Sequence, residues 1–317
     1  MNNSLKVIKK VIKKSKKVAI FTHIDPDFDA LGSSIALKCS LRLIGKMADV
    51  YIKDKLTFNQ ELIYKDEEIF NTKCQFNEYD LLISVDTPSI SRLGDYGEGF
   101  SLHDNTIVVD HHENRGLIGK YNLVNTNSSS CAELVLKIIK SCKLGMNTNI
   151  ASYIFSAISA DTGSFQHTNV NSDTFLNAYE LIKLGANTTF INERQYKSVS
   201  KKEVEFNKYF WNNIQIIKSC AFCLFSIDTL KQLKGSKADC EGFSARLNTL
   251  NKINYSFTIV EEKKGIYKVS LRSKAEFNVR LIAEKLGGGG HDCAAGATIN
   301  AGDIQEAKNK VLSLILK

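Results

Sequence analysis

Residues 18–33, VAIFTHIDPDFDALGS, join a short apolar run to the beginning of a helical pattern through a loop that holds one histidine and three aspartates. The run at 18–22 predicts a buried strand, and the spacing of apolar residues over 30–44 predicts a helix. A tight loop between the two can direct several oxygen and nitrogen atoms at one point. We therefore expect a strand, a ligand-rich loop and a helix in this order.

The same alternation continues as far as residue 160. Apolar runs at 49–53, 80–86 and 106–110 predict strands, and apolar spacing at 132–142 and 149–160 predicts helices. Alternating strands and helices are typical of an α/β fold in which a parallel sheet has helices on both faces. Ligands of such sheets bind beyond the carboxyl ends of the strands, which is where the first loop lies.

The pattern changes after Gly185, where a polar, helix-favouring segment follows. Beyond this segment the sequence predicts strands at 214–227, 254–260 and 267–272 and a helix at 279–286. We therefore divide the chain into a first domain at 1–190, a helical connector at 191–213 and a smaller mixed α/β domain at 214–317. The functional site is expected in the cleft between the two domains.

The charge is distributed unevenly along the chain. Residues 1–17 have a net charge of +7, residues 18–190 a net charge of −7 and residues 191–317 a net charge of +8. This division is expected if carboxylates of the first domain hold cations while the second attracts an anionic substrate. Solvated surfaces without a function also vary by this much, so the charge alone leaves both interpretations open.

Composition excludes several other classes of protein. No apolar stretch reaches the roughly 18 to 20 residues that a membrane-spanning helix needs, so we expect no membrane span. The basic segment 1–17 lacks the apolar centre of a secretion signal and predicts a packed first helix, with binding to membranes or RNA left open. Eight scattered cysteines indicate a reducing cytoplasm, and Cys220 and Cys223 are expected to be buried in a strand.

Four places in the first domain present aspartate or histidine directly after an apolar strand or helix: the loop 23–29, Asp86, the triplet 110–112 and Asp161. Each has a plain structural explanation when taken alone, such as a helix cap or a turn. Together, however, carboxylates that converge at one sheet edge repel each other unless cations neutralise them. A mixed carboxylate and imidazole set suits Mn²⁺, Fe²⁺, Co²⁺ or Zn²⁺.

These motifs, in this order, resemble the DHH phosphoesterase family, whose name is the triplet Asp110, His111 and His112. The four glycines at 287–290 followed by His291 resemble the signature of the DHH-associated C-terminal domain, so the resemblance extends from about 18 to 299. It implies a DHH catalytic domain at 1–190 and a DHH-associated substrate-binding domain at 214–317. The branch to which the sequence is most similar comprises the nanoRNases, some of which also dephosphorylate 3′-phosphoadenosine 5′-phosphate.

The resemblance implies two divalent metal ions, of which Mn²⁺ is expected. The ligands that it implies are His23, Asp27, Asp29, Asp86, His111 and Asp161. His23 and Asp27 would bind one ion, Asp86 would bridge the two, and the remaining three would bind the second. Two ions that share a ligand can activate a water molecule and stabilise the charge that develops during phosphoryl transfer.

The resemblance also implies residues beyond the metal ligands. Asp110 would orient the ring of His111, and His112 would bind the scissile phosphate and protonate the leaving oxygen as the catalytic residue. Substrate binding would fall to Arg272, Gly288, Gly289, Gly290 and His291. A guanidinium binds phosphate with two hydrogen bonds, and glycines let backbone N–H groups approach an anion closely. A surface arginine and a flexible turn are the plain alternatives.

The leading hypothesis is a hydrolase that converts very short oligoribonucleotides to mononucleotides and 3′-phosphoadenosine 5′-phosphate to AMP. Cyclic or linear dinucleotides are alternative substrates, and inorganic pyrophosphate is disfavoured by the motif at His291. A non-catalytic nucleotide-binding protein is the alternative from another class, and the presence of all six ligands argues against it. We expect no binding of long duplex nucleic acid, and a homodimer as the commonest oligomeric state.

Overall fold

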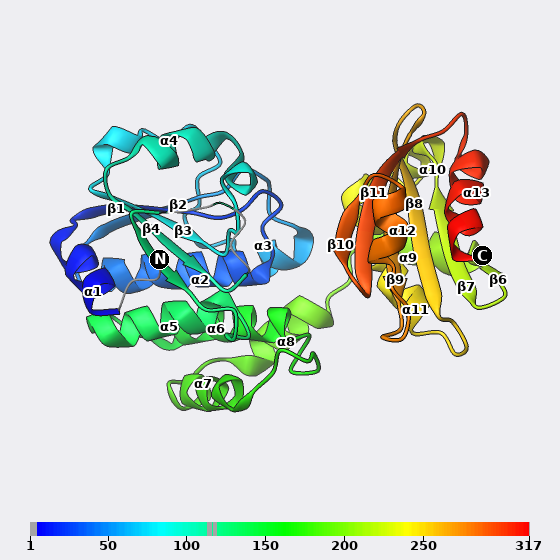
Figure 1. Ribbon diagram of the computed structural model, residues 1–317. Coiled ribbons are helices and arrows are strands. Elements are labelled where there is room, and N and C mark those ends of the chain that lie inside the picture. Colours follow the sequence, from blue (N-terminus) through cyan, green and yellow to red (C-terminus); the bar gives the residue numbers. More distant parts are fainter. Residues whose placement is uncertain (1–4, 113–115, 117–118, 317) are drawn as a thin grey trace. The chain divides into compact units, whose positions relative to one another are not determined.

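The computed structural model describes residues 5–112, 116 and 119–316 (Figure 1). The chain divides into two compact units, Met1–Ser198 and Val199–Lys317. This division falls within the segment 191–213 that the sequence predicts as a connector.

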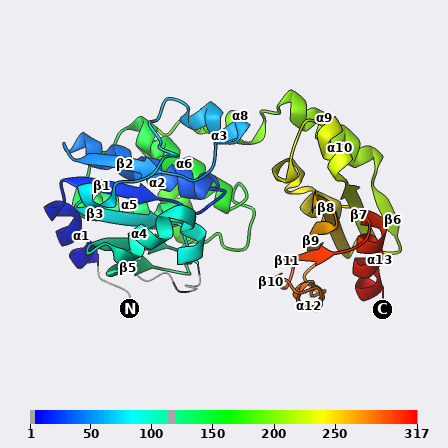
Figure 2. The ribbon, with the colours of Figure 1, turned by 90° about the horizontal axis from the view of Figure 1, so that it is seen from above.

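A five-stranded parallel sheet forms the centre of the first unit, in the order β2-β1-β3-β4-β5. Its strands are β1 (Lys17–Phe21), β2 (Met47–Tyr51), β3 (Leu81–Val85), β4 (Thr106–Asp110) and β5 (Tyr121–Val124). Figure 2 shows β2 and β5 at opposite edges of this sheet, with β1 and β3 between them. The predicted α/β class with a parallel sheet is confirmed, and β5 is a strand that the sequence pattern did not indicate.

Helices cover both faces of this sheet, as predicted (Figure 1). The face lined by Val18, Ile20 and Ile83 packs in the main core, to which α1 (Leu5–Lys14), α2 (Phe28–Leu43), α5 (Cys131–Cys142) and α6 (Thr148–Asp161) contribute. The opposite face, which carries Phe21 and Leu82, packs against the 3-10 helix η2 (Ile90–Tyr96) and α4 (Gly97–Leu102). The remaining helices of the unit are α3 (Phe58–Tyr64), the 3-10 helix η1 (Phe76–Glu78), α7 (Ser172–Lys183) and α8 (Thr188–Tyr196). Alternate residues of the central strands β1, β3 and β4 therefore enter different cores, which explains why these strands are apolar along most of their length.

Two of these helices approach each other closely at Gly32 of α2. A Cβ atom added there would lie 2.5 Å from the carbonyl oxygen of Tyr153 and 2.9 Å from Cβ of Ala157, both on α6. Only glycine permits this separation of the two backbones. The contact is relevant to the site because Asp29 lies in the first turn of α2 and Asp161 is the last residue of α6.

The basic N-terminal segment is a helix that packs through its apolar side. Ile8 and Ile12 of α1 are fully buried, and Leu5 and Val11 are partly buried against the same core. The predicted packing of this helix is therefore confirmed. Among the helices of the described residues, none has the length and apolar character that crossing a membrane requires.

A six-stranded sheet forms the second unit, in the order β10-β11-β9-β8-β7-β6, and only β7 and β8 run parallel. Its strands are β6 (Gln215–Ile217), β7 (Cys220–Phe225), β8 (Tyr255–Lys263), β9 (Ile266–Ser273), β10 (Gly289–His291) and β11 (Ala294–Asn300). Its helices are α9 (Lys201–Asn212), α10 (Ile227–Gln232), the 3-10 helix η3 (Lys237–Cys240), α11 (Phe243–Asn248), α12 (Arg280–Lys285) and α13 (Ile304–Ile315). The predicted mixed α/β character of this part is confirmed.

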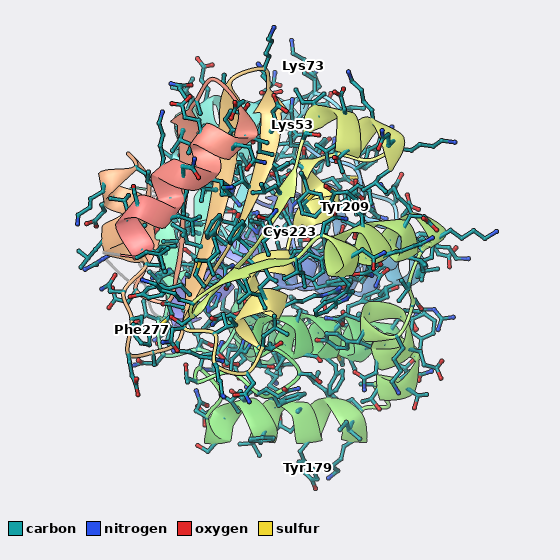
Figure 3. The ribbon with its side chains drawn as sticks, turned by 90° about the vertical axis from the view of Figure 1, so that its right-hand side faces the viewer. Lys53, Lys73, Tyr179, Tyr209, Cys223 and Phe277 are labelled. Carbon is teal, nitrogen blue, oxygen red and sulfur yellow. The ribbon has the colours of Figure 1, made fainter. Side chains whose placement is uncertain are left out.

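The paired cysteines of the second unit are buried in β7, as the sequence predicts. Cys220 and Cys223 enter the two different cores on opposite sides of the sheet, and Figure 3 marks the position of Cys223. Burial raises the pKa of each thiol to about 12, so both remain protonated at neutral pH. All eight cysteines of the chain are free thiols.

Candidate metal centre

The carboxyl edge of the parallel sheet carries most of the predicted ligands. His23 follows β1, Asp86 follows β3, and His111 follows β4. Asp27 is the N-cap of α2, where its carboxylate accepts a hydrogen bond from the N–H of Ala30 at 2.9 Å. Strands of a parallel sheet end at the same edge, so side chains that are far apart in the sequence meet there.

Asp86 leaves β3 with a left-handed backbone, at a φ of 58°. Left-handed conformations are unfavourable for residues other than glycine, although aspartate tolerates them better than most. The backbone N–H of Asp86 donates to the carbonyl of Val109 at 2.9 Å, which holds this turn against the next strand. Strain of this kind is typical of functional sites, since the surrounding structure must hold it in place.

The candidate ligand atoms form three overlapping groups, and the atoms of each group lie within 4.8 Å of one another. The groups are His23, Asp27 and Asp86; Asp29, His111 and Asp161; and Asp86, His111 and His112. Asp86 and His111 each belong to two of them, and Oδ1 of Asp86 lies 3.5 Å from Nε2 of His111. The structure thus brings together all six side chains that the sequence analysis names as ligands.

Two of the carboxylates are almost completely buried. Asp29 and Asp86 each expose 1% of their surface, and burial raises the pKa of both well above the usual range of an aspartate. Neighbouring carboxylates add to this effect, because the charge of Asp86 further raises the pKa of Asp29. Burial also raises the pKa of Asp161, and it lowers the pKa of His23. Without a cation, the cluster therefore resists the negative charge that its residues would carry in water.

Hydrogen bonding provides an independent test of whether the cluster fits a cation. Oδ1 of Asp86 and Nε2 of His111 are buried and have no hydrogen-bond partner among the described residues. Buried polar atoms are normally paired, since leaving one unpaired costs about 1 to 3 kcal/mol. The carboxylate and imidazole atoms in this arrangement fit a divalent metal ion.

Backbone carbonyls orient the two candidate histidine ligands. Nδ1 of His23 lies 2.8 Å from the carbonyl oxygen of Ile24, and Nδ1 of His111 lies 3.2 Å from that of Ser128. A carbonyl can only accept, so Nδ1 of His111 carries a proton when this bond forms, and its Nε2 is left as a lone-pair donor. Nδ1 of His23 also lies 3.0 Å from Nη2 of Arg92, which can only donate, so the Ile24 carbonyl alone does not fix the tautomer of His23. Nε2 of His111 lies 3.4 Å from Oδ2 of Asp161 and 3.5 Å from Oδ1 of Asp86.

Asp110 is placed differently from the sequence-based expectation. We expected it to orient His111, but its Oδ1 accepts from Nδ1 of His112 at 2.9 Å and from the backbone N–H of His112 at 3.2 Å. An aspartate readily bonds to the residue two positions later, and the carbonyl of Ser128 already occupies the place beside His111. The bond to Asp110 raises the pKa of His112 to about 9.

His112 also differs from the other members of the cluster in exposure. Its side chain is 47% exposed, compared with 11% for His111 and 2% for Asp86. An exposed imidazole beside a buried ligand cluster can reach a molecule that enters from solvent. The position suits the predicted role at the scissile phosphate.

Two of the residues predicted for substrate binding, Arg272 and His291, lie in one row of the second sheet. Arg272 of β9 pairs with Ala294 of β11, and Ala294 pairs with His291 of β10. Residues directly opposite each other in a sheet point to the same face, and adjacent strands are about 4.8 Å apart. Arg272 and His291 therefore share one face at a separation of roughly 10 Å between strands. Burial lowers the pKa of the half-buried Arg272.

Two glycines of the predicted anion-binding motif are also required because the neighbouring backbone leaves no room for a side chain. Cβ atoms at Gly288 and Gly290 would lie 2.1 Å from the carbonyl oxygen of Gly296 and 2.6 Å from that of Ala294. Gly290 also has a φ of 142°, a conformation that other residues rarely adopt. Gly289, in contrast, meets nothing within 4 Å and is exposed, so space for a ligand remains on this strand.

Three residues near these sites were not named from the sequence. Arg92 places Nη2 3.0 Å from Nδ1 of His23, and Lys268 of β9 is a second cation on the face that carries Arg272. Glu133 lies in the first turn of α5, where it is 1% exposed. For Glu133, the one available signal was its position as an acidic residue within the predicted apolar helix 132–142. Arg92 belongs to a polar stretch in which local patterns carry no such information, whereas Lys268 lies four positions before Arg272 in the predicted strand 267–272, a spacing that places both on one face.

Comparison with protein families agrees with the architecture. The model of the DHH family, N-terminal domain, matches residues 17–158, and the model of the DHHA1 domain matches residues 226–317. The bifunctional oligoribonuclease and PAP phosphatase NrnA of Thermus thermophilus is 29% identical over 303 residues, which cover 94% of this chain and 89% of that protein.

Solved structures show the same fold. An exopolyphosphatase-related protein from Bacteroides fragilis matches with a TM-score of 0.87 at 22% identity. The match covers 98% of this chain and 95% of the Bacteroides fragilis chain. A crystal structure of exonuclease RecJ bound to manganese matches with a TM-score of 0.56 at 15% identity, covering 100% of this chain and 95% of its own. The chain therefore belongs to the DHH family of phosphoesterases and carries a DHHA1 domain in its second unit.

Proposed function

We propose that this protein is a metal-dependent hydrolase that converts very short oligoribonucleotides to mononucleotides and 3′-phosphoadenosine 5′-phosphate to AMP. The observation that carries this proposal is the position of the buried carboxylate of Asp86 between two ligand groups. It belongs to the group of His23 and Asp27, and its Oδ1 lies 3.5 Å from Nε2 of His111, which belongs to the other group. The relative named for both activities aligns with 94% of the chain, including the DHHA1 domain. Catalysis is therefore expected to need both metal sites.

Two divalent metal ions, with Mn²⁺ as the preferred ion, are proposed to occupy the cluster. His23 and Asp27 would hold the first ion, the group of Asp29, His111 and Asp161 the second, and Asp86 both. The name of the RecJ structure records manganese in a protein of the same fold. When bound, such ions lower the pKa of a water molecule and polarise phosphoryl oxygens.

His112 is proposed to act on the leaving group. Asp110 binds Nδ1–H of its ring, so Nε2 faces away from that carboxylate. A pKa near 9 keeps the ring protonated at neutral pH, and a protonated ring can bind a phosphate oxygen and then donate its proton to the leaving oxygen. Such general acid catalysis typically contributes about 10² to 10⁴ in rate.

Cationic residues outside the cluster are proposed to bind the phosphates and the sugar of the substrate. Arg92 places a guanidinium beside His23 in the first unit. Arg272 and His291 share one face of the second sheet, and the small residues Ala294 and Gly296 lie between their strands. The shared face of Arg272 and His291 supports a substrate with more than one phosphate or with a phosphate and a base.

Chelation is expected to abolish activity, and Mn²⁺ is expected to restore it, because every proposed ligand is an oxygen or an imidazole nitrogen. The measurement is turnover of a dinucleotide by purified protein after treatment with excess chelator, before and after addition of Mn²⁺. Full turnover in excess chelator would contradict a metal-dependent mechanism.

The same assay should be run on a substrate panel to identify the preferred reaction. We expect turnover of a dinucleotide, a pentanucleotide and 3′-phosphoadenosine 5′-phosphate, and little turnover of a long single strand or of pyrophosphate. Faster hydrolysis of cyclic dinucleotides than of the linear forms would move the assignment to a cyclic dinucleotide phosphodiesterase. Binding of a dinucleotide without turnover at any metal concentration would indicate a non-catalytic nucleotide-binding protein.

We further propose that the chain forms a homodimer through α7. This helix buries Leu181 but exposes four large apolar side chains: Phe175, Leu176, Tyr179 and Ile182, each more than half exposed. Figure 3 shows Tyr179 projecting outward from the helix. Asp173 and Lys183 stand at opposite ends of the same helix, so two copies packed antiparallel would place each acid beside a lysine.

Tyr179→Glu is expected to convert a dimer to a monomer without loss of bound metal, since a buried, unpaired carboxylate is costly. Light scattering would measure the mass of both proteins at the same concentration. Leu102→Glu is a matched control, because Leu102 is 78% exposed on α4 and lies outside α7. A monomeric wild-type protein at micromolar concentration, or a dimeric Tyr179→Glu variant, would contradict the proposal.

The compartment proposed for this enzyme is the cytoplasm. The support for this proposal is the state of the thiols. All eight cysteines are free and six of them are buried. A reducing compartment keeps such thiols from forming disulfides.

A further inference from the structure

Glu133 is a buried carboxylate close to the cluster that is absent from the three candidate ligand groups. Its Oε2 accepts hydrogen bonds from Oγ of Ser128 at 2.7 Å and from the backbone N–H of Ser129 at 3.0 Å. Its Oε1 accepts from Nδ2 of Asn177 at 3.2 Å. A buried carboxylate is tolerated only with such partners, so the position of Glu133 and that of the segment 128–129 depend on each other.

The same peptide bond contacts the candidate metal ligand His111. The carbonyl of Ser128 accepts from Nδ1 of His111, and the N–H of Ser129 donates to Glu133. These two groups belong to one peptide unit, which is planar, with its N–H and C=O pointing in opposite directions. A carboxylate that holds the N–H therefore sets the direction in which the carbonyl meets the imidazole.

Capping of α5 does not account for this arrangement. In a capping box, the acid at the third helical position binds the backbone N–H of the N-cap residue, which is Ser130 here. Glu133 occupies that third position, but it binds residues that precede Ser130. The first free N–H groups of the helix, those of Cys131 and Ala132, donate instead to Asp29 at 2.6 and 3.0 Å.

We infer that Glu133 is a positioning residue that orients His111 and fixes its tautomer through the Ser128–Ser129 peptide. Histidine ligands of metals commonly donate their second N–H to a carboxylate or a carbonyl, which fixes the ring and increases its basicity. Here the carbonyl is itself polarised by a carboxylate on the other side of the peptide, and hydrogen bonds in a chain strengthen one another. The inference rests on the proposed metal-dependent function.

The test is Glu133→Gln in the full chain, which removes the charge and keeps the shape of the side chain. We expect the affinity for Mn²⁺, measured by calorimetry, to fall by about 10- to 100-fold, as is typical when the partner of a ligand is changed. In protein loaded with diamagnetic Cd²⁺, nuclear magnetic resonance should show faster solvent exchange of the Nδ1–H proton of His111. Six histidines in the chain keep the spectrum simple, and a His111→Asn variant assigns the resonance.

Leu136→Ala provides the control for a merely structural role, because Leu136 is fully buried on the same helix. This variant should lose thermal stability but keep the Mn²⁺ affinity and the Nδ1–H exchange of the wild type. If Glu133→Gln does not fold, Glu133→Asp retracts the carboxylate and should weaken Mn²⁺ binding in the same direction. Wild-type Mn²⁺ affinity in a folded Glu133 variant, or an equal loss in Leu136→Ala, would overturn the inference.

Failure of the proposed function has a different signature. If the wild-type protein itself binds no Mn²⁺ and hydrolyses no phosphoester, the proposed function and the inference that rests on it are both overturned. If the wild type binds Mn²⁺ and turns over a dinucleotide while Glu133→Gln does both equally well, only the role of Glu133 is wrong.

Discussion

Asp86→Asn is expected to release both metal ions together and to lower kcat by about 10³-fold or more. The carboxylate belongs to the group of His23 and Asp27, and its Oδ1 lies 3.5 Å from Nε2 of His111 in the second proposed site, so its loss affects both sites rather than one. An amide carries no charge and offers only one oxygen, whereas metal ions contribute several kcal/mol of stabilisation to a phosphoryl-transfer transition state. Elemental analysis of the purified variant, together with steady-state kinetics on a dinucleotide, measures both effects.

Loss of metal in this variant is not expected to reflect unfolding. Burial raises the pKa of Asp86 well above its usual range, so a charged carboxylate at this position already destabilises the metal-free wild type. An uncharged asparagine relieves that repulsion, and in chelator the variant should melt no earlier than the wild type. Asp104→Asn is the matched control, since the exposed Asp104 precedes β4 at the edge of the sheet opposite the cluster. Two metals at normal occupancy in Asp86→Asn would refute the shared ligand.

His112→Ala and Arg272→Ala are expected to fail in different ways. His112 touches the cluster through Asp86 and Asp110, so its loss should lower kcat on a dinucleotide by about 10² to 10⁴. Arg272 belongs to the second unit, and loss of a charged hydrogen bond of about 1.5 to 3 kcal/mol should mainly raise KM for the same substrate. Both variants should retain normal metal content.

A small generic ester separates the two roles. Bis-p-nitrophenyl phosphate has no second phosphate for Arg272 to bind, so Arg272→Ala should hydrolyse it nearly as fast as the wild type. His112→Ala should still be impaired, although a good leaving group needs less protonation and reduces the loss. Arg246→Ala is the matched control, because Arg246 is an exposed arginine of the same unit that bonds to Asn207. Equal losses for the His112 and Arg272 variants on the generic ester would refute a separate substrate-binding role for Arg272.

The sequence by itself determined the α/β class and the identity of the residues that meet at the sheet edge. The reason is local: an apolar run defines each strand, and the chain leaves a parallel strand at the same edge every time, so His23, Asp86 and His111 had to be neighbours. The apolar spacing of α5 and α6 and the polar break before the second unit are equally local signals. The sequence did not predict strand β5, because its four residues are too few to show a periodic pattern.

Only the tertiary structure decided which partners these residues have. Asp29 caps α5 through Cys131, 102 positions away, and Asn177 reaches Glu133 across 44 positions. Contacts of this kind depend on how helices pack, for example through Gly32, and no local spacing encodes them. The pairing of Asp110 with His112 depended on the carbonyl of Ser128 occupying the place beside His111. A sequence pattern specifies which face or edge a side chain occupies, whereas its hydrogen bonds are set by groups that folding brings from elsewhere in the chain.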